Sequence, residues 1–205
     1  MSLRDEGAAA VVATEKSALR AWLRAERALG HAARSLEEAR RAAQGAAELL
    51  AAASFAALEE PSCAALYHPL PGELDPAPIG ALLRERGARL CLPRVVRLTP
   101  PLLGFHLVAE GAALVPGRFG LQEPSADAPL ADAPTVFVVP GLGFDRAGHR
   151  LGFGRGLYDG ALRAQPSGLR VALCYPQALR PAIPHTEDDE PMDLIVTPQE
   201  LIVTH

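Results

Sequence analysis

Residues 135–162 read TVFVVPGLGFDRAGHRLGFGRGLYDGAL and carry the strongest fold signal in the chain. Thr135–Val139 is a short run of β-branched and aromatic residues that Pro140 and Gly141 stop, the pattern of a buried strand leading into a functional loop. Two glycine-rich turns follow, and a helix is expected to begin near Leu157. A strand, a glycine-rich loop and a helix in this order predict an α/β protein.

The glycine spacing in this loop indicates an anion site. Gly152, Gly154 and Gly156 alternate, so backbone N–H groups can face an oxyanion without Cβ atoms in the way. Arg150 and Arg155 offer charge-assisted donors, and the next helix adds its N-terminal dipole. The spacing matches neither the dinucleotide-binding fingerprint nor the P-loop. A hairpin tip or close strand packing explains such a run equally well, so both interpretations stay open.

Two acidic residues of this stretch have different expected roles. Asp145 fits the first position of a type I turn, and the turn role is the preferred interpretation. Asp159 lies one turn into the expected helix. Its carboxylate either caps the helix N-terminus or holds Mg²⁺ against bound phosphates.

The first sixty residues predict a helical hairpin that follows a loose arm over residues 1–13. The first helix is expected over about residues 14–30, with an apolar face of Leu19, Trp22, Leu23 and Leu29. Ser35 and Glu38 form a capping box that opens a second helix, rich in alanine and leucine, which runs toward Leu58.

A line of cations recurs at helical spacing beside this apolar face. Its members are Lys16, Arg20, Arg24 and Arg27. A solvated helix face is one explanation. The spacing of Lys16 and Arg20 could equally deliver two cations to a single anion.

Short apolar runs alternate with helical segments over the rest of the chain. Strands are expected at residues 64–67, 89–92, 102–108, 135–139, 169–174, 194–197 and 201–204. Another helix is expected between an N-cap at Asp75-Pro76 and Gly87. The alternation predicts a mainly parallel sheet covered on both faces. We therefore expect an α/β fold, three-layer α/β/α with an N-terminal helical hairpin, in one domain over residues 1–205.

The composition argues against several classes of protein. A net charge of −4 gives no reason to expect a nucleic-acid partner, and the apolar run at 45–58 is too short to cross a bilayer. Cys63, Cys91 and Cys174 have neither metal nor disulfide spacing and are expected as buried thiols. The N-terminus does not resemble a signal peptide. We expect a cytoplasmic monomer that binds neither nucleic acid nor membrane.

Six short elements, taken in order, resemble one known family. They are Lys16-x-x-Leu19-Arg20; Tyr67-His68 through Asp75; Leu92-Pro93-Arg94-Val95; FGLQEP at 119–124; VPGLGFD at 139–145 with GHRLG at 148–152 and Tyr158-Asp159; and the closing segments 184–189 and 193–197. From Lys16 to Thr197 they resemble the 5-formyltetrahydrofolate cyclo-ligases, also called methenyltetrahydrofolate synthetases.

The resemblance implies an ATP- and Mg²⁺-dependent enzyme on a sheet with helices on both sides. Its substrates would be 5-formyltetrahydrofolate and ATP, and its products 5,10-methenyltetrahydrofolate, ADP and phosphate, by way of an imino-phosphate. A non-catalytic folate-binding protein on the same scaffold is the alternative. A sugar-phosphate or CoA-handling enzyme has less support, because no candidate glutamate or isomerase base stands out.

The resemblance also implies roles for particular residues. The ATP-binding residues would be Lys16, Arg20, Arg150, Leu151, Gly152, Phe153, Gly154, Arg155, Gly156, Leu157 and Tyr158. The catalytic residues among these would be Lys16, Arg20, Arg150, Arg155 and Tyr158. The folate would contact His68, Glu73, Phe153, Gly154, Arg155, Gly156 and Leu157. The magnesium ligands would be Asp159 and Asp193.

Two positions depart from the family pattern. Phe153 stands where some members carry arginine, and Leu157 replaces the aromatic residue that usually precedes Tyr158. The second departure removes an aromatic surface on which the folate could stack. Neither departure removes a charge that the expected chemistry needs.

Overall fold

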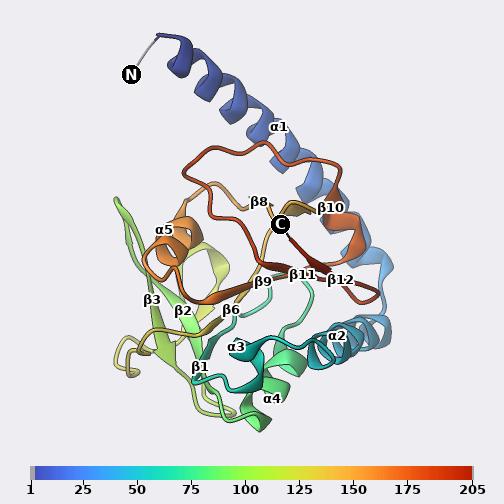
Figure 1. The fold of residues 1–205 in the computed structure, drawn as a ribbon, viewed down its shortest axis with the longest axis vertical. Helices are drawn as coiled ribbons and strands as arrows, with labels where there is room; N and C mark the ends of the chain where they lie inside the picture. Colours follow the sequence, from blue (N-terminus) through green and yellow to red (C-terminus); the bar gives the residue numbers. More distant parts are fainter. Residues whose placement is uncertain (1–2, 205) are drawn as a thin grey trace.

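The computed structural model describes residues 3–204 and is built around a seven-stranded sheet (Figure 1). In spatial order its strands are β12 (Leu201–Val203), β11 (Leu194–Val196), β9 (Leu169–Leu173), β6 (Val136–Val139), β1 (Cys63–Ala65), β2 (Arg89–Leu98) and β3 (Pro101–Leu107). The five central strands are parallel, and β12 and β3 pair antiparallel at the two edges. The expected mainly parallel sheet is confirmed.

Neighbouring residues of each central strand enter two different cores. Along β6, Val136 and Val138 pack into one core, while Phe137 and Val139 pack into the other. All four side chains are buried. Both faces of the sheet are covered, which explains why a parallel strand reads as a continuous apolar run without alternation.

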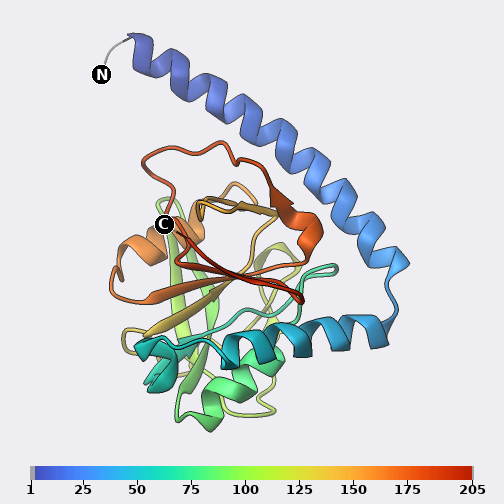
Figure 2. The ribbon, with the colours of Figure 1, turned by 45° about the vertical axis from the view of Figure 1, so that its right-hand side comes forward.

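Helices cover both faces of the sheet, as Figures 1 and 2 show. α2 (Leu36–Ala51) and α4 (Ala77–Glu85) pack together on one face, with the short α3 (Ala56–Glu59) beside them. On the other face, α5 (Leu157–Arg163) buries Ala161 and Leu162. The expected three-layer arrangement and the helix start at Leu157 are confirmed.

The first helix, α1 (Leu3–Ala33), begins earlier and packs less than the sequence predicts. The expected loose arm is helical from Leu3 onward, because alanine-rich sequence continues the helix toward the N-terminus. This end extends beyond the rest of the molecule (Figure 2). On the expected apolar face Leu23 is buried, whereas Trp22 and Leu29 are 44% and 67% exposed. Neither α1 nor any other described helix is long and apolar enough to cross a bilayer.

The two N-terminal helices do not pack along each other as a hairpin. Only Arg34 and Ser35 separate them, but they diverge from this joint in Figures 1 and 2. The buried face of α2 instead packs against α4 and the sheet. α2 ends at Ala51, short of the expected Leu58, and the chain turns so that Leu58 reaches the same core from α3.

Several short elements escape prediction from the sequence. A small sheet has the order β10 (Leu179–Arg180), β7 (Gly143–Asp145) and β8 (Arg150–Leu151). A hairpin of β4 (Val115–Pro116) and β5 (Gln122–Glu123) encloses a 3₁₀ turn, η1 (Arg118–Gly120), and a second such turn is η2 (Pro176–Ala178). Strands of two or three residues are too short to show the alternation of apolar and polar side chains that marks a strand. Whether such a segment forms a strand depends on the segment with which it pairs.

The order of the parallel strands reverses between β1 and β6. After β1 the chain moves outward to β2, whereas after β6 it moves in the opposite direction to β9 and β11. Loops that leave the carboxyl ends of strands at such a point diverge and leave a crevice. The segments that follow β1 and β6 are therefore where a ligand site is expected.

Removing the N-cap of α2 is expected to cost stability. Ser35 Oγ accepts a hydrogen bond from the Glu38 N–H at 3.2 Å, and Glu38 accepts one from the Ser35 N–H at 2.8 Å. Ser35→Ala should lower the free energy of unfolding by about 1 kcal/mol, measured by chemical denaturation. Ser17→Ala is the control, because Ser17 is exposed within α1 and alanine favours a helix. Equal losses in both variants would contradict a role for the cap.

Candidate active site

A cavity of about 500 Å³ lies at the carboxyl ends of β1 and β6, where the strand order reverses. This volume is typical of small-molecule sites. Its lining residues are Lys16, Arg20, Arg24, Tyr67, His68, Leu70, Glu73, Pro93, Val95, Leu103, Phe119, Leu121, Gln122, Glu123, Pro140, Asp189 and all of residues 150–159. The cavity therefore joins α1, the loops after β1 and β6, and the apolar surface of β2 and β3.

Arginines of α1 hold this helix against the loops that follow β6. Arg20 Nε donates to the Gly152 carbonyl at 3.0 Å, and Arg24 Nη2 donates to the Phe153 carbonyl at 3.4 Å. Arg27 Nη2 donates to the Gly141 carbonyl. The basic line of α1 thus faces the loops after β6. Arg20 and Arg27 are partly buried there, so the explanation as a solvated face is wrong for these two residues, whereas Arg24 reaches the loop but stays exposed.

Glycines in the loop leave room for two guanidinium groups. A Cβ atom on Gly152 would lie 2.6 Å from Arg150 Nη1, and one on Gly154 would lie 3.2 Å from Arg20 Cζ. Gly154 also has a φ of +90°, which side chains rarely adopt. The close approach of the Arg150 and Arg20 guanidinium groups to the backbone is therefore one reason why glycine stands at positions 152 and 154.

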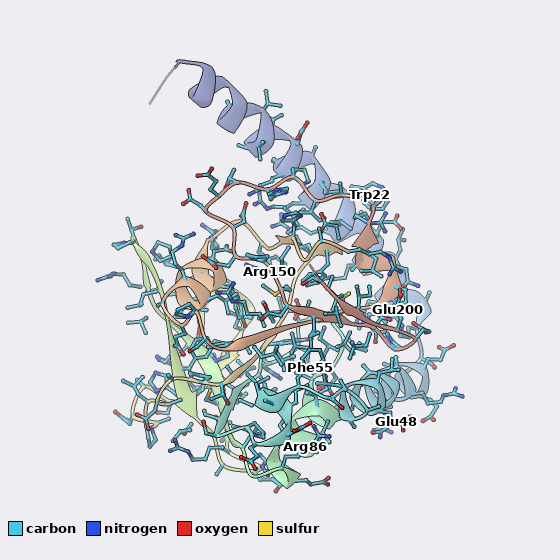
Figure 3. The ribbon with its side chains drawn as sticks, viewed as in Figure 1. Trp22, Glu48, Phe55, Arg86, Arg150 and Glu200 are labelled. Carbon is cyan, nitrogen blue, oxygen red and sulfur yellow. The ribbon has the colours of Figure 1, made fainter. Side chains whose placement is uncertain are left out.

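Two carboxylates beside the loop are each paired with a cation. Arg150 Nη2 donates to Asp159 Oδ1 at 2.7 Å, and Lys16 Nζ donates to Asp189 Oδ2. Burial by itself raises the pKa of Asp189, but hydrogen bonds from Lys16 and Thr186 outweigh it and hold this pKa below its usual value. Figure 3 shows Arg150 near the middle of the molecule, and its side chain is buried.

The cations around the loop outnumber these two carboxylates. They are Lys16, Arg20, Arg24, Arg150 and Arg155. Burial lowers the pKa of Arg20, and the neighbouring Arg24 guanidinium lowers it further. A ligand with several negative charges would relieve this repulsion.

Glu73 supplies a buried carboxylate in another part of the cavity. Its Oε1 accepts from Arg27 Nη1 and its Oε2 from the Leu70 N–H, both at 2.9 Å. Burial raises the pKa of Glu73, although Arg27 and the Leu70 N–H act in the opposite direction. Each oxygen keeps a lone pair with which it can accept from a ligand.

The opposite wall of the cavity is largely apolar. Val95 and Leu103 come from β2 and β3, and Leu121 comes from the β4–β5 hairpin. Glu123 anchors the hairpin to this wall, because its Oε1 accepts from the Val95 N–H at 3.2 Å and its Oε2 lies 3.4 Å from Arg94 Nη1. The cavity thus has a cationic end and a wall suited to a flat, apolar ring.

One expected site residue lies elsewhere. Asp193 immediately precedes β11, at the end of the sheet opposite the cavity, and its Oδ2 accepts from the Arg170 N–H at 2.7 Å. A metal site formed jointly by Asp159 and Asp193 is incompatible with this placement. Every other expected site residue, including His68 and Glu73, lines the cavity.

Asp189 is a carboxylate beside the glycine-rich loop that was not expected as a site residue, and Glu123 is a second unexpected carboxylate of the cavity. Asp189 belongs to a run of four acidic residues at 187–190. The run was a visible signal, but the pattern alone does not say which of the four points inward. The hydrogen bond from Lys16 identifies it in the structure.

Asp145 has the turn role that the sequence predicts. Its carboxylate accepts from the backbone N–H groups of Ala147, His149 and Ile183 at 3.1, 3.0 and 2.8 Å. The side chain is buried and does not line the cavity. Asp145 therefore stabilises the loop between β7 and β8, and its bond from the Ile183 N–H holds the chain around residue 183 next to this loop.

The fold and the cavity define a three-layer α/β protein that is suited to a ligand both polyanionic and flat. The model of the 5-formyltetrahydrofolate cyclo-ligase family matches residues 12–198. The chain belongs to this family of enzymes, and the resemblance carried by the short motifs is confirmed.

Individual relatives agree with this assignment. The 5-formyltetrahydrofolate cyclo-ligase of Escherichia coli K12 is 31% identical over 147 residues, which cover 67% of this chain and 78% of the relative. That of Mycolicibacterium smegmatis is 35% identical over 142 residues, covering 63% and 71%. The mitochondrial enzyme of Arabidopsis thaliana is 45% identical over 84 residues, and this match spans only 30% of its length and 35% of this chain.

Solved structures show the same architecture. The 5,10-methenyltetrahydrofolate synthetase of Aquifex aeolicus superposes with a TM-score of 0.74 at 30% identity, covering 92% of each chain. That of Mycoplasma pneumoniae gives a TM-score of 0.69 at 21% identity, covering 90% of this chain and 99% of that one. The second similarity supports the fold alone.

Removing Lys16 is expected to change stability in a pH-dependent way. Because the pKa of Asp189 is lowered in the folded state, the ionised pair stabilises the fold above about pH 4 and this contribution is lost as the pH falls through the lowered pKa. Lys16→Met should lower the free energy of unfolding by about 1 kcal/mol at pH 7. The difference should be smaller at about pH 3, which lies below the usual pKa of an aspartate.

Denaturation curves of the unsubstituted protein and of Lys16→Met, recorded at about pH 7 and about pH 3, measure this effect. Arg146→Met is the control, because its exposed pair with Glu200 should contribute little at either pH. If Lys16→Met lowers the free energy of unfolding by the same amount at both pH values, the lowered pKa of Asp189 does not depend on Lys16.

Proposed function

We propose that this chain uses Mg-ATP to convert 5-formyltetrahydrofolate into 5,10-methenyltetrahydrofolate, with release of ADP and phosphate. The observation that carries the proposal is the convergence of Lys16 and Arg20 with residues 150–159 in one cavity. The apolar wall opposite gives a second ligand a place beside the first. Family membership supports the identity of the substrate.

The triphosphate of ATP would lie at the cationic end of the cavity. Lys16, Arg20, Arg150 and Arg155 would neutralise its charge, and the backbone of residues 151–158 would enclose it. The salt bridges that Lys16 and Arg150 now make would be shared with phosphate oxygens. Tyr158, beneath the Arg150 guanidinium, would keep this cation in position.

The folate would lie along the apolar wall and reach Glu73. The pterin of a reduced folate carries several N–H groups, and Glu73 is a buried acceptor with unused lone pairs. Burial raises the pKa of this carboxyl, and a more basic carboxylate is a stronger acceptor. His68 lies in the same cavity and offers a further polar contact.

Asp159 and Asp189 fit a magnesium ion. Mg²⁺ commonly takes one or two carboxylates together with substrate phosphates and water, and within residues 3–204 no group of three or more acidic, His or Cys side chains forms a metal cage. When bound, the ion would offset negative charge on the phosphate oxygens. Asp189 would therefore replace Asp193, which the family resemblance implied as the second magnesium ligand.

The chemistry requires that the formyl oxygen become a leaving group. This oxygen would attack the γ-phosphorus, so that the P–O bond to ADP breaks and an imino-phosphate forms at N5. N10 would then attack the formyl carbon as the C–O bond to phosphate breaks and the N10 proton is lost. Ring closure gives the methenyl product, and ADP and phosphate account for the remaining atoms.

The protein would contribute alignment and charge neutralisation to this sequence. Phosphoryl transfer needs little covalent help, but the attacking oxygen must be in line with the leaving group. Arginine and lysine side chains aimed at the phosphate stabilise the charge that develops. Loss of one such donor typically costs about 3–4 kcal/mol of barrier.

A single assay tests the proposed function. The purified protein is mixed with 5-formyltetrahydrofolate, ATP and Mg²⁺, and the methenyl chromophore and ADP are followed together. We expect both products to form. The methenyl chromophore should appear only when ATP is present, and ADP only when 5-formyltetrahydrofolate is present. A protein that binds the folate yet releases no ADP would instead be the non-catalytic folate binder on the same scaffold.

Removing the buried guanidinium should reduce turnover strongly. Arg150→Met keeps the side-chain volume but removes a donor to the phosphates, so kcat/KM for ATP should fall by about 10²–10³-fold. Steady-state kinetics measure the loss, and thermal melting checks that the fold persists. Arg146→Met, on the exposed surface, should keep full activity. Equal activity in the two variants would remove Arg150 from the site.

The two candidate metal carboxylates can be separated by matched variants. Asp189→Asn should raise the Mg²⁺ concentration for half-maximal activity by at least about tenfold, because a ligand is lost. Asp193→Asn should leave this concentration unchanged, because Asp193 lies at the other end of the sheet. Titration of activity with MgCl₂ measures both. A larger effect from Asp193→Asn would overturn the assignment.

A further inference from the structure

Phe119 has a backbone conformation that large side chains rarely adopt. Within residues 3–204 it is the only non-glycine residue with a positive φ, at φ 60° and ψ 25°. Such strain at a bulky residue persists only where the surroundings enforce it, and it concentrates at functional sites. The next residue, Gly120, also has a positive φ, of 75°, and there the chain uses glycine. A glycine at position 119 would adopt the same backbone conformation without strain.

The strained residue places an aromatic ring on the wall of the cavity. Phe119 lies at the tip of the β4–β5 hairpin, which Glu123 fixes to Val95. Phe119 lines the cavity, and the residue as a whole is 49% exposed. An exposed phenyl ring on a strained backbone contributes little to folding, so the fold alone does not explain it.

Arg155 covers this ring from the opposite side of the cavity. Its guanidinium carbon lies 4.9 Å from the centroid of the Phe119 ring. In the described part of the chain the Arg155 side chain forms no ion pair or hydrogen bond, and Gly154 and Gly156 on either side both have positive φ. The contact therefore joins the glycine-rich loop to the hairpin through one cation–π pair that can be released.

The other aromatic rings of the cavity are less available. Tyr67 donates its hydroxyl to the Leu74 carbonyl, and Tyr158 lies beneath Arg150. Phe153 has two guanidinium groups, those of Arg24 and Arg27, at 5.7 and 5.5 Å from its centroid. Phe119 is 49% exposed against 40% for Phe153, and one guanidinium contacts it where two contact Phe153. It is also suited to replace the aromatic surface that Leu157 lacks.

We propose that Phe119 is a folate-contacting residue, and that Arg155 covers its ring until ATP binds. This inference rests on the proposed function. A triphosphate attracts a guanidinium more strongly than a phenyl ring does, so Arg155 turns to the phosphates when ATP is present. The uncovered ring then packs against the flat aromatic part of the folate. ATP therefore raises the affinity for the folate.

Variants at Phe119 separate ligand contact from a structural role. Phe119→Gly removes the ring and relieves the positive φ, so the affinity for 5-formyltetrahydrofolate should fall by about 5- to 10-fold while the melting temperature does not fall. The KM for ATP should stay within about twofold. Phe119→Tyr should restore folate affinity. Val96→Ala, which removes another exposed apolar side chain outside the cavity, should change neither affinity.

Calorimetry with a non-hydrolysable ATP analogue tests the covering by Arg155. The analogue should tighten folate binding to the unsubstituted protein and do so much less in Phe119→Gly. Unchanged folate affinity in Phe119→Gly, or a lowered melting temperature with equal loss for both substrates, would overturn the proposal. Failure of the unsubstituted protein to bind the folate would instead refute the proposed function, and this inference with it.

Discussion

The hydrogen bonds between the arginines of α1 and the carbonyl groups after β6 are the interaction on which the cavity depends. Arg20, Arg24 and Arg27 each donate to a different backbone oxygen of this region. The apolar contribution of the same helix is small, because Leu23 is its only buried apolar side chain in the structure described. Charge-assisted hydrogen bonds therefore set where α1 lies. Local opening of α1 would remove several cations from the cavity together and leave the sheet intact.

Features with a local cause were predictable from the sequence. The strand at β6, the capping box at Ser35 and the helix start at Leu157 each depend on a few neighbouring residues, and all three are confirmed. The direction of α1 relative to α2 was not predictable. Helical spacing shows that a side of α1 is apolar, but only the tertiary fold decides that Leu23 enters the core while Trp22 stays half-exposed beneath the Arg180 guanidinium.

In the candidate site, too, features with a local cause were predictable and features that depend on the tertiary fold were not. Cations at helical spacing and alternating glycines were visible in the sequence, and the structure brings both into one cavity. Asp189 and Asp193 are four positions apart and chemically alike, so their separation to opposite ends of the sheet depends on the path of the chain after residue 183. The positive φ of Phe119 has no sequence signal of its own, because glycine marks such positions and phenylalanine does not.

The pairing of Lys16 with Asp189 has a consequence for how the molecule matures. These side chains are 173 positions apart, so Lys16 is synthesised long before Asp189. Five of the seven strands of the central sheet, β1, β2, β3, β6 and β9, precede Asp189 and can pair before it has been synthesised. The cationic cavity cannot be completed until the segment that carries Asp189 emerges and reaches the first helix. A nascent or truncated chain can therefore be largely folded while the Lys16–Asp189 side of the cavity is still missing.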